Sequence, residues 1–238
     1  MIKARTVTVM VGTCQKPEFL PYIRAATRTH RETTGGHLLF IDNEIHTPAH
    51  EANSNVIREE LRLLGYEYHR HEECFNLNLL YNLGAEMTES DYIIYTISDL
   101  LFFPRWWSEL KAALDSSGCY SAHPRSFEAV HEGLQYFREF QSPSAIRETA
   151  LIETQEPPCY VTATKRETCH VWDEAFPGWE QDCDYWETLK KMGEQSVINP
   201  RSRVDHLWAP VSGHMDMVHE ATVSRADLTS NFRKKWNK

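Results

Sequence analysis

The segment YTISDLLFFPRWW, residues 95–107, places an aspartate between two apolar runs. The run before it, from Tyr92 to Ile97, favours a buried β-strand. Asp99 is poorly suited to the interior of a strand, and a buried carboxylate is costly without a partner. A proline and two tryptophans follow within a few residues. A carboxylate carried to the end of a buried strand in this setting indicates a functional group.

Strand and helix signals alternate on both sides of this segment. Apolar runs predict strands over residues 6–13, 36–43 and 91–98. Helical periodicity predicts helices over residues 17–30, 54–66, 75–87 and 104–118. Ser54 is a candidate N-cap of the second helix, and Gly65 is a stop signal for it. Strands separated by helices of this length indicate an α/β fold with a mostly parallel sheet flanked by helices.

Beyond residue 118 the alternation is weaker. The patterns predict strands over residues 118–124 and 159–167, a helix around 128–140, a loop leading into a helix over 172–193, and a strand with a following loop over 196–208. Because no linker-like composition separates the two halves, we expect a single domain spanning residues 1–238.

The composition is that of an ordinary globular protein, with 41% hydrophobic and 25% charged residues. The net charge of −9 argues against a general nucleic-acid surface. Two basic clusters indicate either solvated helix faces and a frayed tail or a local contact with a phosphate-bearing partner: Arg24, Arg28 and Arg31, and Arg233, Lys234, Lys235 and Lys238. No apolar stretch approaches the length that spans a bilayer. The six scattered cysteines form no CxxC pair, which favours reduced thiols and a cytoplasmic location.

Two groups of carboxylates stand out. Asp42 and Asp99 both lie where a predicted strand ends, and in open parallel sheets ligands bind at the strand ends, so both are expected to line one crevice. Asp42 can equally be a turn residue that precedes Asn43. The second group is GWEQDCDYW, residues 178–186, in which Glu180, Asp182 and Asp184 alternate with other residues between two tryptophans.

Structure alone explains part of the second group, because acidic side chains are favoured at a helix N-terminus. The alternatives are ligation of Mg²⁺ or Mn²⁺ and action as a general base. His206, in RVDHLW, is by itself more typical of a hydrogen-bonded loop residue, unless it meets Asp99 in space.

Three segments together resemble the GT-A glycosyltransferases, and the family-two-like members in particular. YTISDLLFFPRWWSELKAAL resembles their metal-binding strand end, FNLNLLYNLGAEMTESDYIIY the helix before it, and VWDEAFPGWEQDCDYWETLKKMG their later acidic segment. The resemblance covers residues 6–120 and 159–208. It implies a Rossmann-like GT-A fold, with a nucleotide-sugar half at about 1–118 and an acceptor half at about 119–238.

The resemblance also implies roles for single residues. Asp99 takes the position of the aspartate that binds a divalent cation, Mn²⁺ or Mg²⁺, and His206 that of a late histidine that completes the metal shell in some members. Ile97 stands where the first acid of the Asp-x-Asp pattern belongs, so the sequence departs from the family there. Thr13 and Asp42 match positions that contact the nucleoside. We assign Asn82, Ser98 and Trp179 to the donor site with them.

Asp182 matches the family's catalytic base on the acceptor hydroxyl, with Glu180 and Asp184 as rivals. These matches predict an inverting, metal-assisted transferase whose donor is a nucleotide-sugar, expected to be a UDP-sugar. The acceptor stays open among saccharides, lipids, proteins and modified nucleic-acid bases. Two alternatives remain: a non-catalytic nucleotide- or carbohydrate-binding domain on the same scaffold, and a metal-dependent nucleotidyltransferase. The segment GTCQKPEFLP, residues 12–21, is a poor version of the Gly-rich basic loop that the latter carries.

Overall fold

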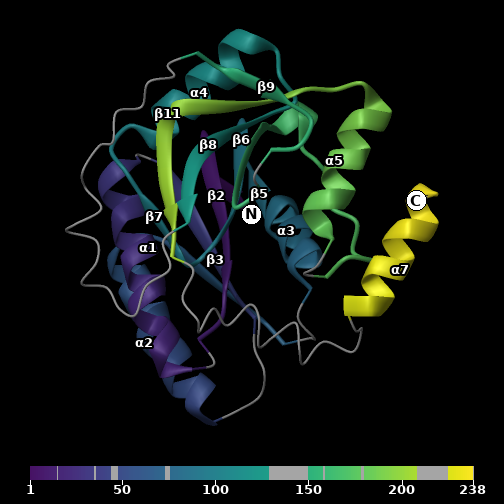
Figure 1. Cartoon of the computed structure of the whole chain (residues 1–238). Helices are drawn as coiled ribbons and strands as arrows, with labels where there is room; N and C mark the ends of the chain where they lie inside the picture. Colours follow the sequence, from purple (N-terminus) through teal and green to yellow (C-terminus); the bar gives the residue numbers. More distant parts are fainter. Residues whose placement is uncertain are drawn as a thin grey trace.

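A single nine-stranded sheet organises the chain, with helices packed on its two faces (Figure 1). The structure is a computed structural model. It describes residues 1–14, 16–34, 36–43, 48–72, 76–128, 150–157, 159–177, 180–207 and 225–237. The expected helix around 128–140 lies almost wholly outside the described residues, and Glu128 itself ends a strand.

The first half of the sheet is parallel, as the sequence predicts. Its order is β4-β3-β2-β6. The strands are β2 (Thr6–Gly12), β3 (His37–Asn43), β4 (Glu67–His71) and β6 (Tyr92–Ile97). All seven residues of β2 are buried, because helices cover both faces of the sheet here. A separate two-stranded sheet pairs β1 (Ile2–Lys3) with β5 (Thr88–Glu89).

The second half of the sheet is mixed, so the expectation of a mostly parallel sheet is correct only for the first half. β10 runs antiparallel to both β6 and β8, β11 runs parallel to β8, and β7 and β9 run antiparallel to β11. These strands are β7 (Leu100–Phe102), β8 (Ser121–Glu128), β9 (Ile152–Thr154), β10 (Val161–Lys165) and β11 (Ser196–His206). Strand β7 begins three residues after β6 ends, yet it lies at the end of the sheet beside β11 and not beside β6.

The helices divide between the two faces of the sheet. A 3-10 turn (Pro17–Phe19) leads into α1 (Leu20–Thr33), which shares one face with α2 (Pro48–Leu63) and α4 (Trp106–Ser117). The other face carries α3 (Leu77–Glu86) and α5 (Gln181–Met192), and a second 3-10 turn (Arg166–Thr168) follows β10. Helix α2 begins before Ser54, so the expected N-cap there is wrong. Gly65, with a φ of 74°, follows the helix end as predicted.

The two tryptophans that follow Asp99 belong to the core. Trp106 is fully buried between α1 and the sheet, and its indole Nε1 donates a hydrogen bond of 3.0 Å to Thr33 Oγ1. Behind it, His30 is buried between Thr8 Oγ1, at 2.8 Å, and Tyr66 OH, at 2.7 Å. Burial lowers the pKa of His30 to about 3, so the imidazole is neutral and joins strand to helix. Aromatic packing therefore fixes the segment that carries Asp99.

Three residues of the C-terminal basic cluster, Arg233, Lys234 and Lys235, lie on a helix and not on a frayed tail, and Lys238 lies outside the described residues. This helix, α7 (Arg225–Trp236), packs beside α5 at the right of Figure 1. Leu228 is buried, and Phe232 meets Phe176 with ring centroids 6.3 Å apart. In the part of the chain that the structure describes, none of the helices combines the length and apolar character required to cross a bilayer.

Candidate functional site

The carboxyl ends of three parallel strands meet at one edge of the sheet. Gly12 of β2 is in register with Asp42 of β3, and Val11 with Ile97 of β6. The next residue after Ile97, Ser98, lies directly on Gly12: a Cβ atom at Gly12 would fall 2.4 Å from Ser98 Oγ. Glycine is therefore required for the two strand ends to approach. This close approach brings the predicted donor-site residues Thr13, Asp42 and Ser98 to one edge.

Asp42 is fully buried at that edge, and its carboxylate accepts four hydrogen bonds. The donors are Cys14 N at 2.9 Å, Ser54 Oγ at 2.6 Å, Tyr68 OH at 2.6 Å and His50 Nε2 at 3.1 Å. Burial opposes ionisation, but these bonds and the nearby imidazole lower the pKa of Asp42 below its ordinary value.

Asp42 thus ties the ends of β2 and β3 to helix α2 and strand β4. Thr13 is also engaged, because its Oγ1 donates to Asn43 O at 3.1 Å. A direct contact of Asp42 or Thr13 with a ligand stays a prediction. The structure adds a second role, which is to hold the strand ends at fixed positions.

Asp99 and His206 lie side by side, which is the condition that the sequence analysis set for a shared role. Strand β7 pairs with β11 so that Leu100 faces His206, and Leu207 N donates to Asp99 O at 2.8 Å. This backbone pairing sets the two side chains together, with His206 Nε2 at 3.2 Å from Asp99 Oδ2. The other imidazole nitrogen, Nδ1, is buried without a hydrogen-bond partner among the described residues. The ring of Tyr160 packs on His206, with centroids 4.2 Å apart.

This pair fits a divalent cation that is held partly by a substrate. Mg²⁺-sized ions bind one or two protein ligands at about 2.1 Å together with phosphate oxygens, which puts neighbouring octahedral ligands about 3 Å apart. The observed 3.2 Å between Asp99 Oδ2 and His206 Nε2 agrees with that spacing. Within the described residues no cluster of three or more metal-ligating side chains exists, so the pair would need oxygen ligands from elsewhere.

The three acids at the start of α5 have different surroundings. Glu180 adopts a left-handed φ of 63°, and its Oε1 accepts from Thr229 Oγ1 of α7 at 2.8 Å. Asp184 is buried, and its Oδ1 accepts from Lys235 Nζ at 2.7 Å and from Trp236 Nε1 at 2.8 Å. Asp182 is part-exposed, and its Oδ1 is buried without a hydrogen-bond partner in the described structure. Helix α7 therefore donates hydrogen bonds to Glu180 and Asp184, and among the described residues it makes none to Asp182.

Burial raises the pKa of Asp182 to about 6, although hydrogen bonds from Cys159 and Gln181 oppose the shift. Burial raises the pKa of Tyr81, and the negative charges of Asp182 and Asp99 raise it further, so both carboxylates act electrostatically on one buried tyrosine. A carboxylate with a pKa near neutrality is suited to exchange protons with a substrate.

Two other predicted donor-site residues lie differently. Asn82 holds the segment after the second 3-10 turn: its Nδ2 donates to Trp172 O at 2.9 Å, and its Oδ1 accepts from Trp172 N at 2.9 Å. The same Nδ2 lies 3.1 Å from Glu174 Oε1. The amide is thus occupied by the protein, and its contact with a donor stays a prediction. Trp179 lies outside the described residues.

Some residues of the site carry no signal in the sequence. Tyr160, which packs on His206, and Cys159, which contacts Asp182, come just before β10 and belong to no recognisable motif. His50 and Tyr68, which donate to Asp42, come from α2 and β4, 8 and 26 residues after it in the chain. Only the fold brings these partners together.

We expect Lys235→Met to loosen α7 from α5. Lys235 Nζ bridges Asp173 Oδ2 and Asp184 Oδ1, both at 2.7 Å, so its removal leaves Asp184 buried with only the Trp236 bond. Breaking a buried charge pair costs roughly 3–5 kcal/mol, and partial exposure reduces that figure here. Hydrogen exchange should become faster in 225–237 and in the first turn of α5. The neighbouring Lys234→Met is the matched control, and equal protection in the two variants would contradict the role of Lys235.

Comparison with known proteins bears on the fold. No protein-family model matches the chain, and no curated protein matches its sequence. Among solved structures, GalNAc-T7 with UDP, GalNAc and Mn²⁺ is similar with a TM-score of 0.68 at 13% identity. The match covers 98% of this chain and 54% of that one, so this chain spans about half the length of the neighbour.

The chain therefore has the GT-A fold, the α/β architecture of one class of glycosyltransferases. At 13% identity the likeness shows the fold alone. In all, 292 chains of solved structures match, so the architecture is widely shared and does not by itself select an activity. The more specific family-two placement stays a prediction.

Proposed function

We propose that this chain is a glycosyltransferase that uses a nucleotide-sugar donor and a divalent cation at Asp99 and His206. The observation that carries the proposal is the pair itself: a carboxylate and an imidazole 3.2 Å apart, placed where the parallel strands end. A UDP-sugar and Mn²⁺ are the proposed donor and ion, because the structural neighbour was solved with UDP, GalNAc and Mn²⁺. Mg²⁺ is the second choice of ion.

In this proposal each residue has a defined task. Asp99 and His206 hold the cation, which supplies positive charge against the diphosphate that leaves. Asp182 accepts the proton of the acceptor hydroxyl as that oxygen bonds to the anomeric carbon and the bond to the diphosphate breaks. Direct attack of this kind inverts the anomeric configuration. Inversion stays a prediction, which NMR of the first-formed product tests.

Asp182 favours an enzyme over a non-catalytic binding domain on the same scaffold. Burial raises the pKa of this carboxyl to about 6, which costs stability at neutral pH, and groups perturbed in this way cluster at catalytic sites. A nucleotidyltransferase has less support, because residues 12–21 lack the glycine-rich basic loop. The acceptor stays open among saccharides, lipids, proteins and modified nucleic-acid bases, and the cytoplasmic location also stays a prediction.

Calorimetric titration with UDP tests the donor site. We expect Mn²⁺ to tighten UDP binding by at least about tenfold relative to EDTA, because ion and diphosphate share oxygen ligands and bind cooperatively. His206→Gln should remove most of that difference. Equal UDP affinity with Mn²⁺ and with EDTA would contradict the metal assignment, and the absence of UDP binding in both would contradict the donor assignment.

A further inference from the structure

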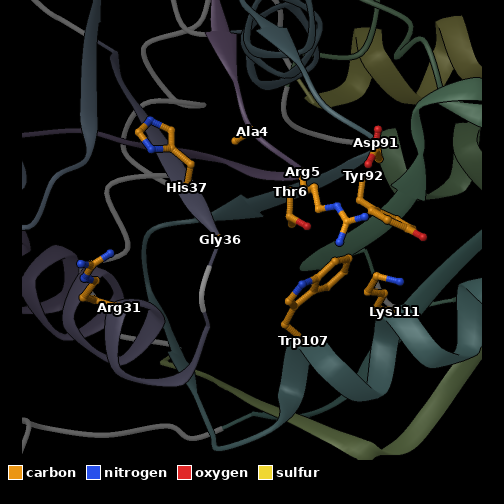
Figure 2. Close-up of a pocket in the computed structure, with 10 residues that line it drawn as sticks. All are labelled: Ala4, Arg5, Thr6, Arg31, Gly36, His37, Asp91, Tyr92, Trp107 and Lys111. Carbon is orange, nitrogen blue, oxygen red and sulfur yellow. The ribbon is translucent and has the colours of Figure 1, made fainter.

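A cavity opens at the opposite edge of the sheet from the proposed donor site, where the parallel strands begin. It has a volume of about 480 Å³ and is lined by residues at or near the starts of β2, β3 and β6 and by residues of α1 and α4 (Figure 2): Ala4, Arg5, Thr6, Arg31, Gly36, His37, Asp91, Tyr92, Trp107 and Lys111. Thr6 and Gly12 are the two ends of β2, so this cavity lies about 20 Å from the proposed donor site.

The charges around the cavity are mainly positive in a chain whose net charge is −9. The lining contains three cationic side chains, Arg5, Arg31 and Lys111, and one carboxylate, Asp91. The guanidinium of Arg5 is exposed and has no hydrogen bond or ion pair with any residue that the structure describes. Its backbone O, in contrast, accepts from Asp91 N and Tyr92 N, both at 3.2 Å. The protein thus holds the main chain of Arg5 in place, while its guanidinium is accessible to a ligand.

The other two cations are held by aromatic rings. Lys111 Nζ lies 4.7 Å from the centre of the Tyr92 ring and also pairs with Asp115 of its own helix, whose carboxylate accepts from Tyr92 OH at 2.6 Å. Arg31 lies over the ring of Tyr66, 5.8 Å from its centre. These contacts orient the positive groups, and Arg31 keeps more donors for a ligand than Lys111, whose ammonium already bonds to Asp115.

Two aromatic rings and a neutral imidazole complete the lining. The ring of Tyr92 packs edge-on against Trp107, with centroids 5.6 Å apart, and Figure 2 shows Arg5 and Lys111 beside these two rings. At the other end of the cavity lies His37, whose Nε2 is buried without a hydrogen-bond partner in the described residues. Burial keeps this imidazole neutral by lowering its pKa. It therefore adds no positive charge to this end of the cavity.

We propose that this cavity binds a phosphate monoester that carries a planar ring, independently of the activity proposed above. Arg5 and Lys111 donate to the phosphate oxygens, because guanidinium and ammonium groups are the usual partners of such anions. The ring lies along Tyr92 and Trp107. Nothing in this arrangement depends on Asp99, His206 or Asp182.

Phenyl phosphate is the probe, titrated calorimetrically in EDTA so that no cation supports binding at the donor site. We expect saturable binding that Arg5→Gln weakens by about tenfold or more, since a charge-assisted hydrogen bond is lost. Lys111→Gln should also weaken it. Arg28→Gln is the matched control: it removes one positive charge from an exposed position on α1 outside the cavity and should leave the affinity unchanged.

Four outcomes would overturn the proposal. The first is the absence of saturable binding by the unaltered protein, and the second is equal affinity in Arg5→Gln and Arg28→Gln. If inorganic phosphate binds as tightly as phenyl phosphate, the ring makes no contribution and the assignment of Tyr92 and Trp107 is wrong. If saturating UDP displaces phenyl phosphate, the two ligands share one site. Trp107 is left unaltered in these tests because it belongs to the core.

Discussion

Asp182→Asn should lower turnover by roughly 10²- to 10⁴-fold, the usual contribution of a general base, while the affinity for the donor stays nearly the same. The substitution keeps the shape of the side chain and removes its basicity. Steady-state kinetics with a donor and an accepted acceptor measure the effect on kcat, and UDP titration measures the effect on binding. Asp182 is the one acid of the three at the start of α5 that makes no hydrogen bond to α7.

The turnover of the unaltered protein and that of Asp182→Asn should depend differently on pH. Burial raises the pKa of Asp182 from its ordinary value of 3.8 to about 6. Turnover should therefore rise between pH 5 and pH 7 as the carboxyl ionises, with an inflection near pH 6, and Asp182→Asn should lose this rise.

The stability of the unaltered protein should fall over the pH range in which its turnover rises. The folded protein holds this proton more tightly than the unfolded chain, so ionisation opposes folding: the penalty is absent below pH 4 and complete above pH 6. It amounts to about 3 kcal/mol at most. Asp182→Asn should therefore raise the Tm at pH 7.5 and leave it nearly unchanged at pH 4.

Glu180→Gln is the matched control for Asp182→Asn. Its amide oxygen still accepts from Thr229 Oγ1, so the contact with α7 remains and the activity should stay within a few-fold of the unaltered protein. If Asp182→Asn is active while Glu180→Gln or Asp184→Asn is inactive, the base has been assigned to the wrong residue.

Asp99→Asn should lower transfer by about a thousandfold or more, since a metal-stabilised leaving group is worth several kcal/mol. Asparagine preserves the shape at the end of β6 and can still contact His206, so the fold should be retained. UDP should then bind with the same affinity in Mn²⁺ as in EDTA. The two readouts separate a lost cation site from a disturbed fold, because a disturbed fold would also weaken UDP binding in EDTA.

Glu59→Gln serves as the control for Asp99→Asn. Glu59 is an exposed carboxylate on α2 that pairs with Arg62, 2.7 Å away, and its loss should leave transfer and metal dependence unchanged. Activity of Asp99→Asn within a few-fold of this control would remove Asp99 from the donor site.

The sequence predicts the parallel half of the fold well, because each strand there is a continuous apolar run and each helix has a clear period. It does not predict β4, whose residues EYHRH carry no apolar alternation, or the three-residue strand β7. Strand β7 looks like an apolar lead into the next helix. Its pairing with β11 depends on residues about a hundred positions further along the chain.

The candidate site, like the fold, can be predicted only in part from the sequence. The pattern of apolar run and aspartate points to Asp99, and the acidic segment points to Asp182 with its neighbours. The meeting of Asp99 with His206 is set by the β7–β11 pairing, and the engagement of Glu180 and Asp184 is set by α7. Long-range packing of this kind leaves no local pattern, so the sequence left the three acids as rivals.

Release of UDP from a panel of UDP-sugars in the presence of Mn²⁺ tests the central claim most directly. Glycosyltransferases transfer sugar slowly to water, so no acceptor has to be known. The account predicts UDP release from at least one donor, abolished by EDTA and by Asp99→Asn and strongly reduced in Asp182→Asn. UDP release that is equal in the unaltered protein and in both variants, or its absence with every donor although UDP itself binds, would contradict the account.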